Sequence, residues 1–186
     1  TQLTIPSLMR FAEDTHGRRE IVSVTMDQPR HRYTYTEAFR RARHAANVLD
    51  RLGCESGDRV ATLAWNDHRH FELYYAIPGA GAAIHTLNPR LPAEQLASMV
   101  DQAGDLVLFY DSTLSELAAQ VAEKSQLPLK LVQLGGAEPA IEGAYSYENL
   151  LEEHPSEGEW ADIDENDAAA ICFTSGTSGN PKGVVY

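Results

Sequence analysis

From residue 59 onward, short apolar segments alternate with segments of helical periodicity, and this alternation is the strongest constraint on the fold. Apolar runs that lack a polar face are typical of strands buried within a parallel sheet. Parallel neighbours need crossover connections, which helices supply. The predicted strands are 59–64, 82–86, 106–110, 129–134 and 168–173. The sequence therefore predicts an α/β fold, with a mostly parallel sheet that has helices on both of its faces.

Helical segments lie between these strands. The first covers residues 67–77 and stops or kinks at Pro78, because proline lacks the amide hydrogen that a helix interior needs. Two further helices are predicted over 92–102 and 114–123, from apolar residues that recur at helical spacing. A short helix at 147–153 lies within an acidic segment, 138–167, which we interpret as a surface connection.

The pattern of the first 53 residues predicts a helix and a β-hairpin that precede the sheet. The expected elements are a helix over 8–14 and a hairpin of strands 21–25 and 32–35. Thr34 and Glu37 have the spacing of a capping box, in which each side chain binds a free amide at the start of a helix. The helix that follows is predicted to end at Gly53.

The charge of the chain and its cysteines exclude several classes of function. Acidic residues number 27 and basic residues 15, so the net charge is −12, which would repel a nucleic acid backbone. Cys54 and Cys172 have no C-x-x-C spacing, which argues against a zinc site or a disulfide framework. There is neither an apolar run of about 18 residues nor a signal-peptide pattern. We therefore expect no nucleic acid partner, no transmembrane segment and a cytoplasmic location.

The residues suited to chemistry concentrate in one loop after the last predicted strand. Ligands of such sheets bind beyond the carboxyl ends of the strands. Residues 174–183 read Thr-Ser-Gly-Thr-Ser-Gly-Asn-Pro-Lys-Gly and hold four hydroxyls, three glycines and a lysine. Glycines let backbone amides approach an anion, hydroxyls donate to phosphoryl oxygens, and the lysine balances charge. A flexible Ser/Gly linker is the alternative, and Pro181 argues against it. The loop is thus predicted to bind a polyphosphate.

Two common nucleotide-binding motifs do not fit this chain. A Walker loop needs a Gly-Lys pair, which the sequence does not contain. The Gly-Ala-Gly stretch at 79–81 follows a helix, whereas a dinucleotide fingerprint follows a strand. A different kind of phosphate loop is therefore indicated.

The order of residues 173–184, Phe-Thr-Ser-Gly-Thr-Ser-Gly-Asn-Pro-Lys-Gly-Val, resembles the phosphate-binding signature of the adenylate-forming, or AMP-binding, enzymes. Ser178 stands where threonine is more usual and keeps the hydroxyl. Residues 57–61 look like the first core strand of that family, and 34–37 like the start of an early helix. The stretch 81–91 is similar to the medium- and long-chain fatty acyl-CoA ligases.

This resemblance implies a two-step ligase, an acid–thiol ligase that forms AMP. A carboxylic acid, here a fatty acid, would attack the α-phosphate of ATP to give an acyl-adenylate, and CoA would then form the thioester and release AMP. Residues 1–186 would be the N-terminal portion of the large AMP-binding domain, with the rest of that domain and a C-terminal domain absent, so this portion alone is expected to be inactive. An adenylating enzyme that loads a carrier protein is one alternative, and a non-catalytic nucleotide-binding module, if the chain is complete, is another. A homodimer also stays open, with no contact residue assigned.

The same resemblance implies roles for individual loop residues. The donors to the β- and γ-phosphates would be Thr174, Ser175, Thr177 and Ser178, with Gly176 and Gly179 permitting close approach. Lys182 would carry the countercharge for the departing pyrophosphate and is the predicted catalytic residue. Thr174 would also help to ligate Mg²⁺.

Residues outside the loop are predicted to be structural. His68 and His70 are two positions apart on a helix, so exposed positions are expected rather than a shared metal. His85 lies in an apolar strand and is predicted to be a core histidine with a satisfied hydrogen bond. Arg40, Arg41 and Arg43 are expected on a solvated basic helix surface, with a subunit contact as the alternative. Cys172 is expected to be a small core residue.

Overall fold

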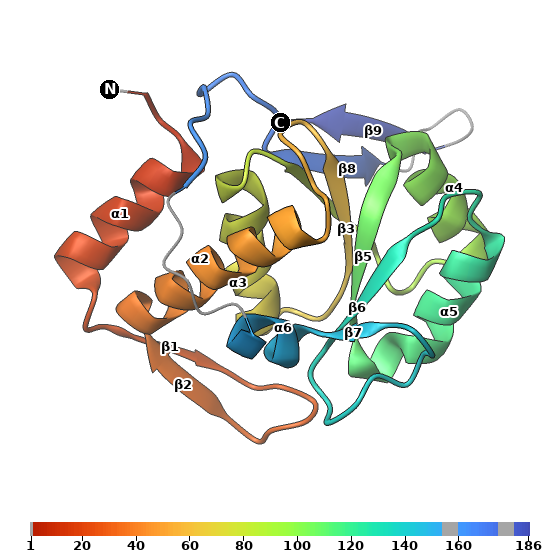
Figure 1. Cartoon of the computed structure of the whole chain (residues 1–186), viewed down its shortest axis with the longest axis horizontal. Helices are drawn as coiled ribbons and strands as arrows, with labels where there is room; N and C mark the ends of the chain where they lie inside the picture. The colour runs from red at the N-terminus through yellow and green to blue at the C-terminus, as the bar shows by residue number, and fades with distance from the viewer. Residues whose placement is uncertain (1, 154–159, 175–180) are drawn as a thin grey trace.

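A seven-stranded sheet forms the centre of the computed structural model, which describes residues 2–153, 160–174 and 181–186 (Figure 1). The order of the strands across the sheet is β7-β6-β5-β3-β4-β8-β9. Every pair of neighbours is parallel except β8 and β9, which are antiparallel. The strands are β3 (Arg59–Leu63), β4 (Ala83–Thr86), β5 (Asp105–Asp111), β6 (Lys130–Leu134), β7 (Tyr145–Ser146), β8 (Ala170–Thr174) and β9 (Lys182–Val185). The predicted mostly parallel α/β sheet is confirmed.

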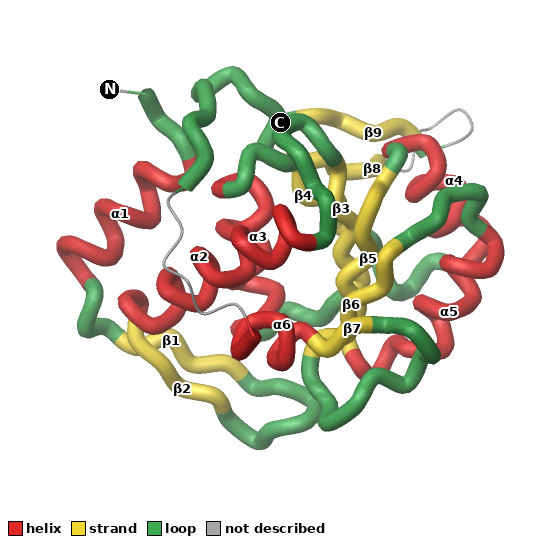
Figure 2. The backbone as a smooth tube through the Cα atoms, viewed as in Figure 1, coloured by secondary structure: helices red, strands yellow, loops and turns green. Residues whose placement is uncertain are grey.

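Helices cover both faces of this sheet, as predicted (Figure 2). One face carries α1 (Ile5–His16), α2 (Tyr35–Arg51), α3 (His68–Gly79) and α6 (Tyr147–Glu153). The other face carries α4 (Ala93–Ala103) and α5 (Ser115–Lys124), with the short 3₁₀ helix η1 (Ser112–Leu114) just before α5. Each face has its own hydrophobic core, because alternate side chains of the buried strands point to opposite sides. Within the described ranges, every helix is too short or too polar to cross a lipid bilayer.

A two-stranded antiparallel hairpin, β1 (Glu20–Ser23) and β2 (His31–Thr34), leads into α2. The predicted capping box at the start of α2 is confirmed. The amide of Glu37 donates to Thr34 Oγ1 at 3.3 Å, and the amide of Thr34 donates to Glu37 Oε2 at 2.7 Å. Two amides that lack a helical partner are therefore satisfied locally, which fixes the direction of α2.

Strand β8 differs from its prediction. It begins two residues later than expected, at Ala170, and Ile171 is its one buried residue. Cys172 is exposed, so the prediction of a core cysteine is wrong. The apolar sequence suggested burial on both faces, but β8 lies next to β9 at one end of the sheet, where its main contacts are with the flanking strands β4 and β9.

Candidate functional site

The carboxyl ends of the parallel strands meet at one edge of the sheet, and the predicted phosphate loop begins there. The loop leaves β8 after Thr174 and re-enters the sheet at Lys182 in β9. Its other assigned residues, Ser175, Gly176, Thr177, Ser178 and Gly179, lie outside the described residues. The structure therefore describes the two ends of the motif, Thr174 and Lys182. Thr174 is the predicted Mg²⁺ ligand and Lys182 the predicted catalytic residue.

Thr174 and Lys182 are cross-strand partners. The antiparallel register of β8 and β9 pairs Thr174 with Lys182, Phe173 with Gly183 and Cys172 with Val184. Partners that lie directly opposite each other point to the same face of a sheet, about 5 Å apart. Both side chains are exposed. The hairpin that β8 and β9 form thus brings a hydroxyl and an ammonium group together, although eight positions separate them in the sequence.

Lys182 differs from the other lysines of the chain in its surroundings. The sequence has three lysines. The ammonium of Lys124 pairs with Glu94 at 3.0 Å, and that of Lys130 donates to the carbonyl oxygen of Leu52. Lys182 has no ion pair with any residue in the described part of the chain. Its charge is therefore available to an anion at the open edge of the sheet.

Helix α3 approaches the β8–β9 hairpin on the face that carries Cys172 and Thr174. Tyr74 of α3 lies near Thr86, at the end of β4, and near Cys172, and burial raises the pKa of its hydroxyl. Tyr74 also lines a cavity of about 330 Å³ between β1 and the start of α3. No lysine or arginine lines this cavity, so its described lining offers no side-chain countercharge for a phosphate.

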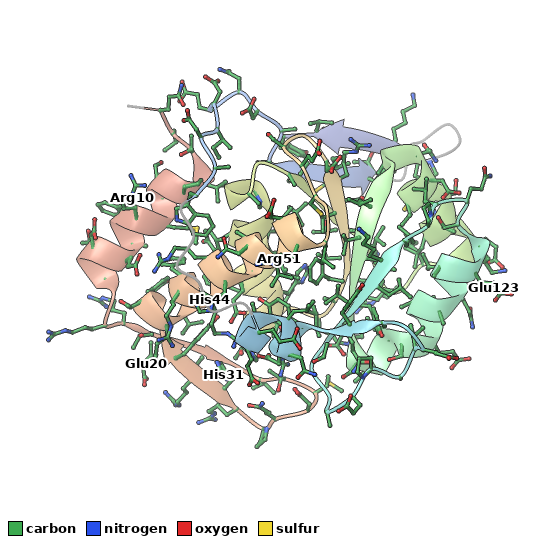
Figure 3. All side chains as sticks on the ribbon, in the orientation of Figure 1. Arg10, Glu20, His31, His44, Arg51 and Glu123 are labelled. Carbon is green, nitrogen blue, oxygen red and sulfur yellow. The ribbon has the colours of Figure 1, made fainter. Side chains whose placement is uncertain are left out.

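His68 and His70 are buried in this region, and the prediction that they are exposed is wrong. Their exposed fractions are 2% and 5%. The His68 ring stacks on His31 with centroids 3.7 Å apart, and His70 Nε2 lies 3.0 Å from Thr62 Oγ1. His31 lies on the β1–β2 hairpin (Figure 3), which covers the start of α3. Burial lowers the pKa of His68 to about 3 and that of His70 to about 4, so both rings are neutral at pH 7.

We expect the protein to become less stable as the pH is lowered, because His68 must stay neutral in the folded state. The folded pKa, about 3, lies below the ordinary value of 6.5, so the unfolded chain takes up the proton first as the pH falls. The stabilisation is complete above pH 6.5 and is lost as the pH falls toward 3, by about 3 kcal/mol at pH 4. Urea unfolding between pH 7 and 4 should show a shallower pH dependence for His68→Gln than for the wild type. The control is His16→Gln at an exposed position, and equal slopes for the wild type and His68→Gln would contradict the prediction.

Arg41 belongs to a buried ionic network, and the prediction that it is solvated is wrong. Its Nε donates to Glu72 Oε1 at 2.8 Å, and its Nη2 lies 3.0 Å from Glu148 Oε2. Glu72 is fully buried and also accepts from the hydroxyl of Tyr147 at 2.8 Å. The network therefore joins α2, α3 and α6 on one face of the sheet.

The described residues do not form a resident metal site. Among them, no group of three or more His, Cys, Asp or Glu side chains could hold a metal ion. The exposed Thr174 offers one hydroxyl, whereas Mg²⁺ takes six oxygen ligands. One protein hydroxyl fits an ion that arrives with ATP and is held mainly by phosphate oxygens and water.

Comparisons with known proteins bear on the family of the chain. A family model described as AMP-binding enzyme matches residues 8–186. The chain is 42% identical over 188 residues to a 3-methylmercaptopropionyl-CoA ligase of Ruegeria lacuscaerulensis, covering 99% of this chain and 35% of that protein. It is 40% identical over 189 residues to a medium-chain-fatty-acid–CoA ligase of Ectopseudomonas oleovorans, covering 100% of this chain and 35% of that protein. The chain thus spans about a third of the length of these relatives.

Solved structures show the same fold. The anthranilate CoA ligase AuaEII in complex with anthranoyl-AMP superposes with a TM-score of 0.89 at 19% identity, over 100% of this chain and 35% of that one. A benzoate CoA ligase from Burkholderia xenovorans superposes with a TM-score of 0.81 at 18% identity, over 99% of this chain and 34% of that one. Identities this low establish the architecture of the sheet and its helices alone.

Proposed function

The chain belongs to the AMP-binding enzyme family, and from that premise we propose that it is part of a ligase that activates a carboxylic acid with ATP and passes the acyl group to CoA. The observation that carries the proposal is the cross-strand pair of Thr174 and Lys182 at the carboxyl edge of the sheet. Residues 1–186 are proposed to form the N-terminal portion of the large AMP-binding domain, which the coverage of the longer relatives supports.

The proposed role of the β8–β9 hairpin is to hold the β- and γ-phosphates of ATP. Thr174 would donate its hydroxyl to a phosphoryl oxygen and contribute one ligand to the Mg²⁺ that ATP carries. The ammonium of Lys182 would neutralise the charge that grows on pyrophosphate as the carboxylate attacks the α-phosphate. Attack at phosphorus converts the carboxylate oxygen into part of a good leaving group, AMP, so the CoA thiol can displace it in the second step. Ser175, Gly176, Thr177, Ser178 and Gly179 are proposed to complete the phosphate contacts.

The acid is proposed to be a fatty or related aliphatic carboxylic acid. Two relatives support this, since one is a 3-methylmercaptopropionyl-CoA ligase and the other a medium-chain-fatty-acid–CoA ligase. Transfer to a carrier protein instead of CoA is the alternative second step. The cytoplasmic location stays a prediction from the cysteines and the sequence patterns, and the homodimer stays a prediction from the family resemblance.

We expect the full-length protein to catalyse exchange of pyrophosphate into ATP when a suitable carboxylic acid is present. A panel of straight-chain and thioether acids, assayed without CoA, would identify the acid. Thioester formation with CoA, compared with a carrier protein at the same concentration, would identify the acceptor. A protein that binds ATP but shows no exchange with any acid of the panel would contradict the proposed reaction and support a nucleotide-binding module.

A further inference from the structure

His85 and Asp105 form a buried polar pair close to the β8–β9 hairpin. His85 lies in β4 and Asp105 at the start of β5, and both side chains are fully buried. His85 Nδ1 lies 2.7 Å from Asp105 Oδ2. Within the described residues, the other polar atom of each side chain, His85 Nε2 and Asp105 Oδ1, has no hydrogen-bond partner. The predicted burial of His85 is thus confirmed, but only Nδ1 has the expected hydrogen bond, and the acidic partner Asp105 is an addition from the structure.

Stability alone is a poor explanation for this pair. A buried ion pair costs several kcal/mol of lost hydration, and apolar residues of similar size often replace such pairs at no loss. Here two buried polar atoms also lack partners, which adds a cost of about 1–3 kcal/mol for each. The pair does, however, fix the rotation of the imidazole, since the bond between Nδ1 and Oδ2 forms whichever of the two groups holds the proton.

The imidazole in turn contacts the strand that carries the phosphate-binding residues. The ring centroids of His85 and Phe173 are 4.9 Å apart, on the face of the sheet that packs against α4 and α5. Phe173 directly precedes Thr174, and its cross-strand partner is Gly183, next to Lys182. A Cβ on Gly183 would lie only 3.2 Å from the Phe173 ring. The Phe173 ring is therefore confined between the His85 ring on one side and the backbone of β9 at Gly183 on the other.

We propose that His85, held by Asp105, is a positioning residue for the phosphate-binding hairpin. Its ring supports Phe173, and Phe173 sets the relative placement of Thr174 and Lys182 on the opposite face of the two strands. The inference rests on the proposed function, because it assigns a role in ATP binding. It assigns no substrate contact to His85 itself.

The test compares two substitutions in the full-length ligase. His85→Asn keeps an amide nitrogen close to the position of Nδ1, for Asp105, but removes the ring that supports Phe173. Asp105→Asn keeps an acceptor for Nδ1 and leaves the ring in place. We expect His85→Asn to raise the Kd for ATP, measured by titration calorimetry, by about 10-fold to 100-fold, because small misplacements of binding groups have effects of this size. Asp105→Asn should bind ATP nearly as the wild type does, and the KM for the carboxylic acid should be unchanged in both variants.

Three further variants separate positioning from general destabilisation. Phe109→Leu removes a buried ring on the other face of the sheet and should lower the Tm without changing the Kd for ATP. Phe173→Leu combined with His85→Asn should show a non-additive effect on that Kd, since both act through one contact. Gly183→Ala disturbs the same ring from the solvent side and tests the inference even if His85→Asn fails to fold.

Distinct results would overturn the inference and the proposed function. An unchanged Kd for ATP in both His85→Asn and Gly183→Ala, or additive effects of His85→Asn and Phe173→Leu, would refute the positioning role. If the KM for the acid rises as much as the Kd for ATP, the effect is general and the role is also refuted. Absence of acid-dependent exchange in the wild type would instead refute the ligase reaction.

Discussion

Lys182→Ala in the full-length protein is expected to slow formation of the acyl-adenylate by about 100-fold to 1000-fold, the usual cost of removing one preorganised group that stabilises developing charge. The reason is electrostatic. Within the described residues Lys182 has no carboxylate partner, and the β8–β9 register holds it opposite Thr174. Single-turnover measurements with acid, ATP and enzyme would give the rate. Formation of the thioester from a preformed adenylate should be affected much less, because pyrophosphate has already left.

Two lysine controls sharpen this prediction. Lys182→Arg keeps the positive charge and should recover part of the rate, although its fork of donors differs in shape from an ammonium. Lys124→Ala removes a partly exposed lysine that pairs with Glu94 and should leave both half-reactions unchanged. Equal losses in the two half-reactions for Lys182→Ala would show that Lys182 does not act on departing pyrophosphate.

Glu72→Ala is expected to lower the free energy of unfolding by about 3–5 kcal/mol, the range for breaking a buried ion pair. The substitution leaves the guanidinium of Arg41 and the hydroxyl of Tyr147 without the acceptor that both now share. Burial raises the pKa of Glu72, while the charge of Arg41 and the two donors favour its ionised form. Urea unfolding at pH 7 would measure the change.

Matched variants distinguish the buried network from ordinary surface charge. Glu72→Gln keeps the size of the side chain and one acceptor oxygen, so it should cost less than Glu72→Ala. Glu94→Gln breaks the exposed pair with Lys124 and should cost less than about 1 kcal/mol. If Glu72→Ala and Glu94→Gln cost the same, the network contributes no more than a solvent-exposed pair.

Local patterns were sufficient to predict most of the fold. The apolar runs 59–64 and 106–110 are strands in the central sheet, and the capping box of Thr34 and Glu37 starts α2, because these signals involve residues close in the sequence. The two described ends of the predicted loop, Thr174 at the carboxyl end of β8 and Lys182 at the start of β9, lie at the edge of the sheet where the sequence predicts them.

Burial and ion pairing at a distance were not predictable in the same way. His68 is buried because the hairpin that contains His31 lies over it, and its position on a helix gives no sign of that cover. Arg41 meets Glu148, which lies 107 positions away. Cys172 was predicted to be buried from its apolar neighbours, but the composition of a strand does not reveal which strands flank it. Tertiary packing decided each of these environments.

The antiparallel pairing of β8 and β9 also limits how this region can change in length. Gaining or losing residues between positions 174 and 182 leaves Thr174 opposite Lys182, provided that both strands keep their pairing. A slip of β9 by a single position would turn Lys182 to the opposite side of the sheet, whereas a slip by two positions would restore its side but not its partner. A change in the number of residues between the strands therefore preserves this pairing, whereas an insertion or deletion within either strand breaks it.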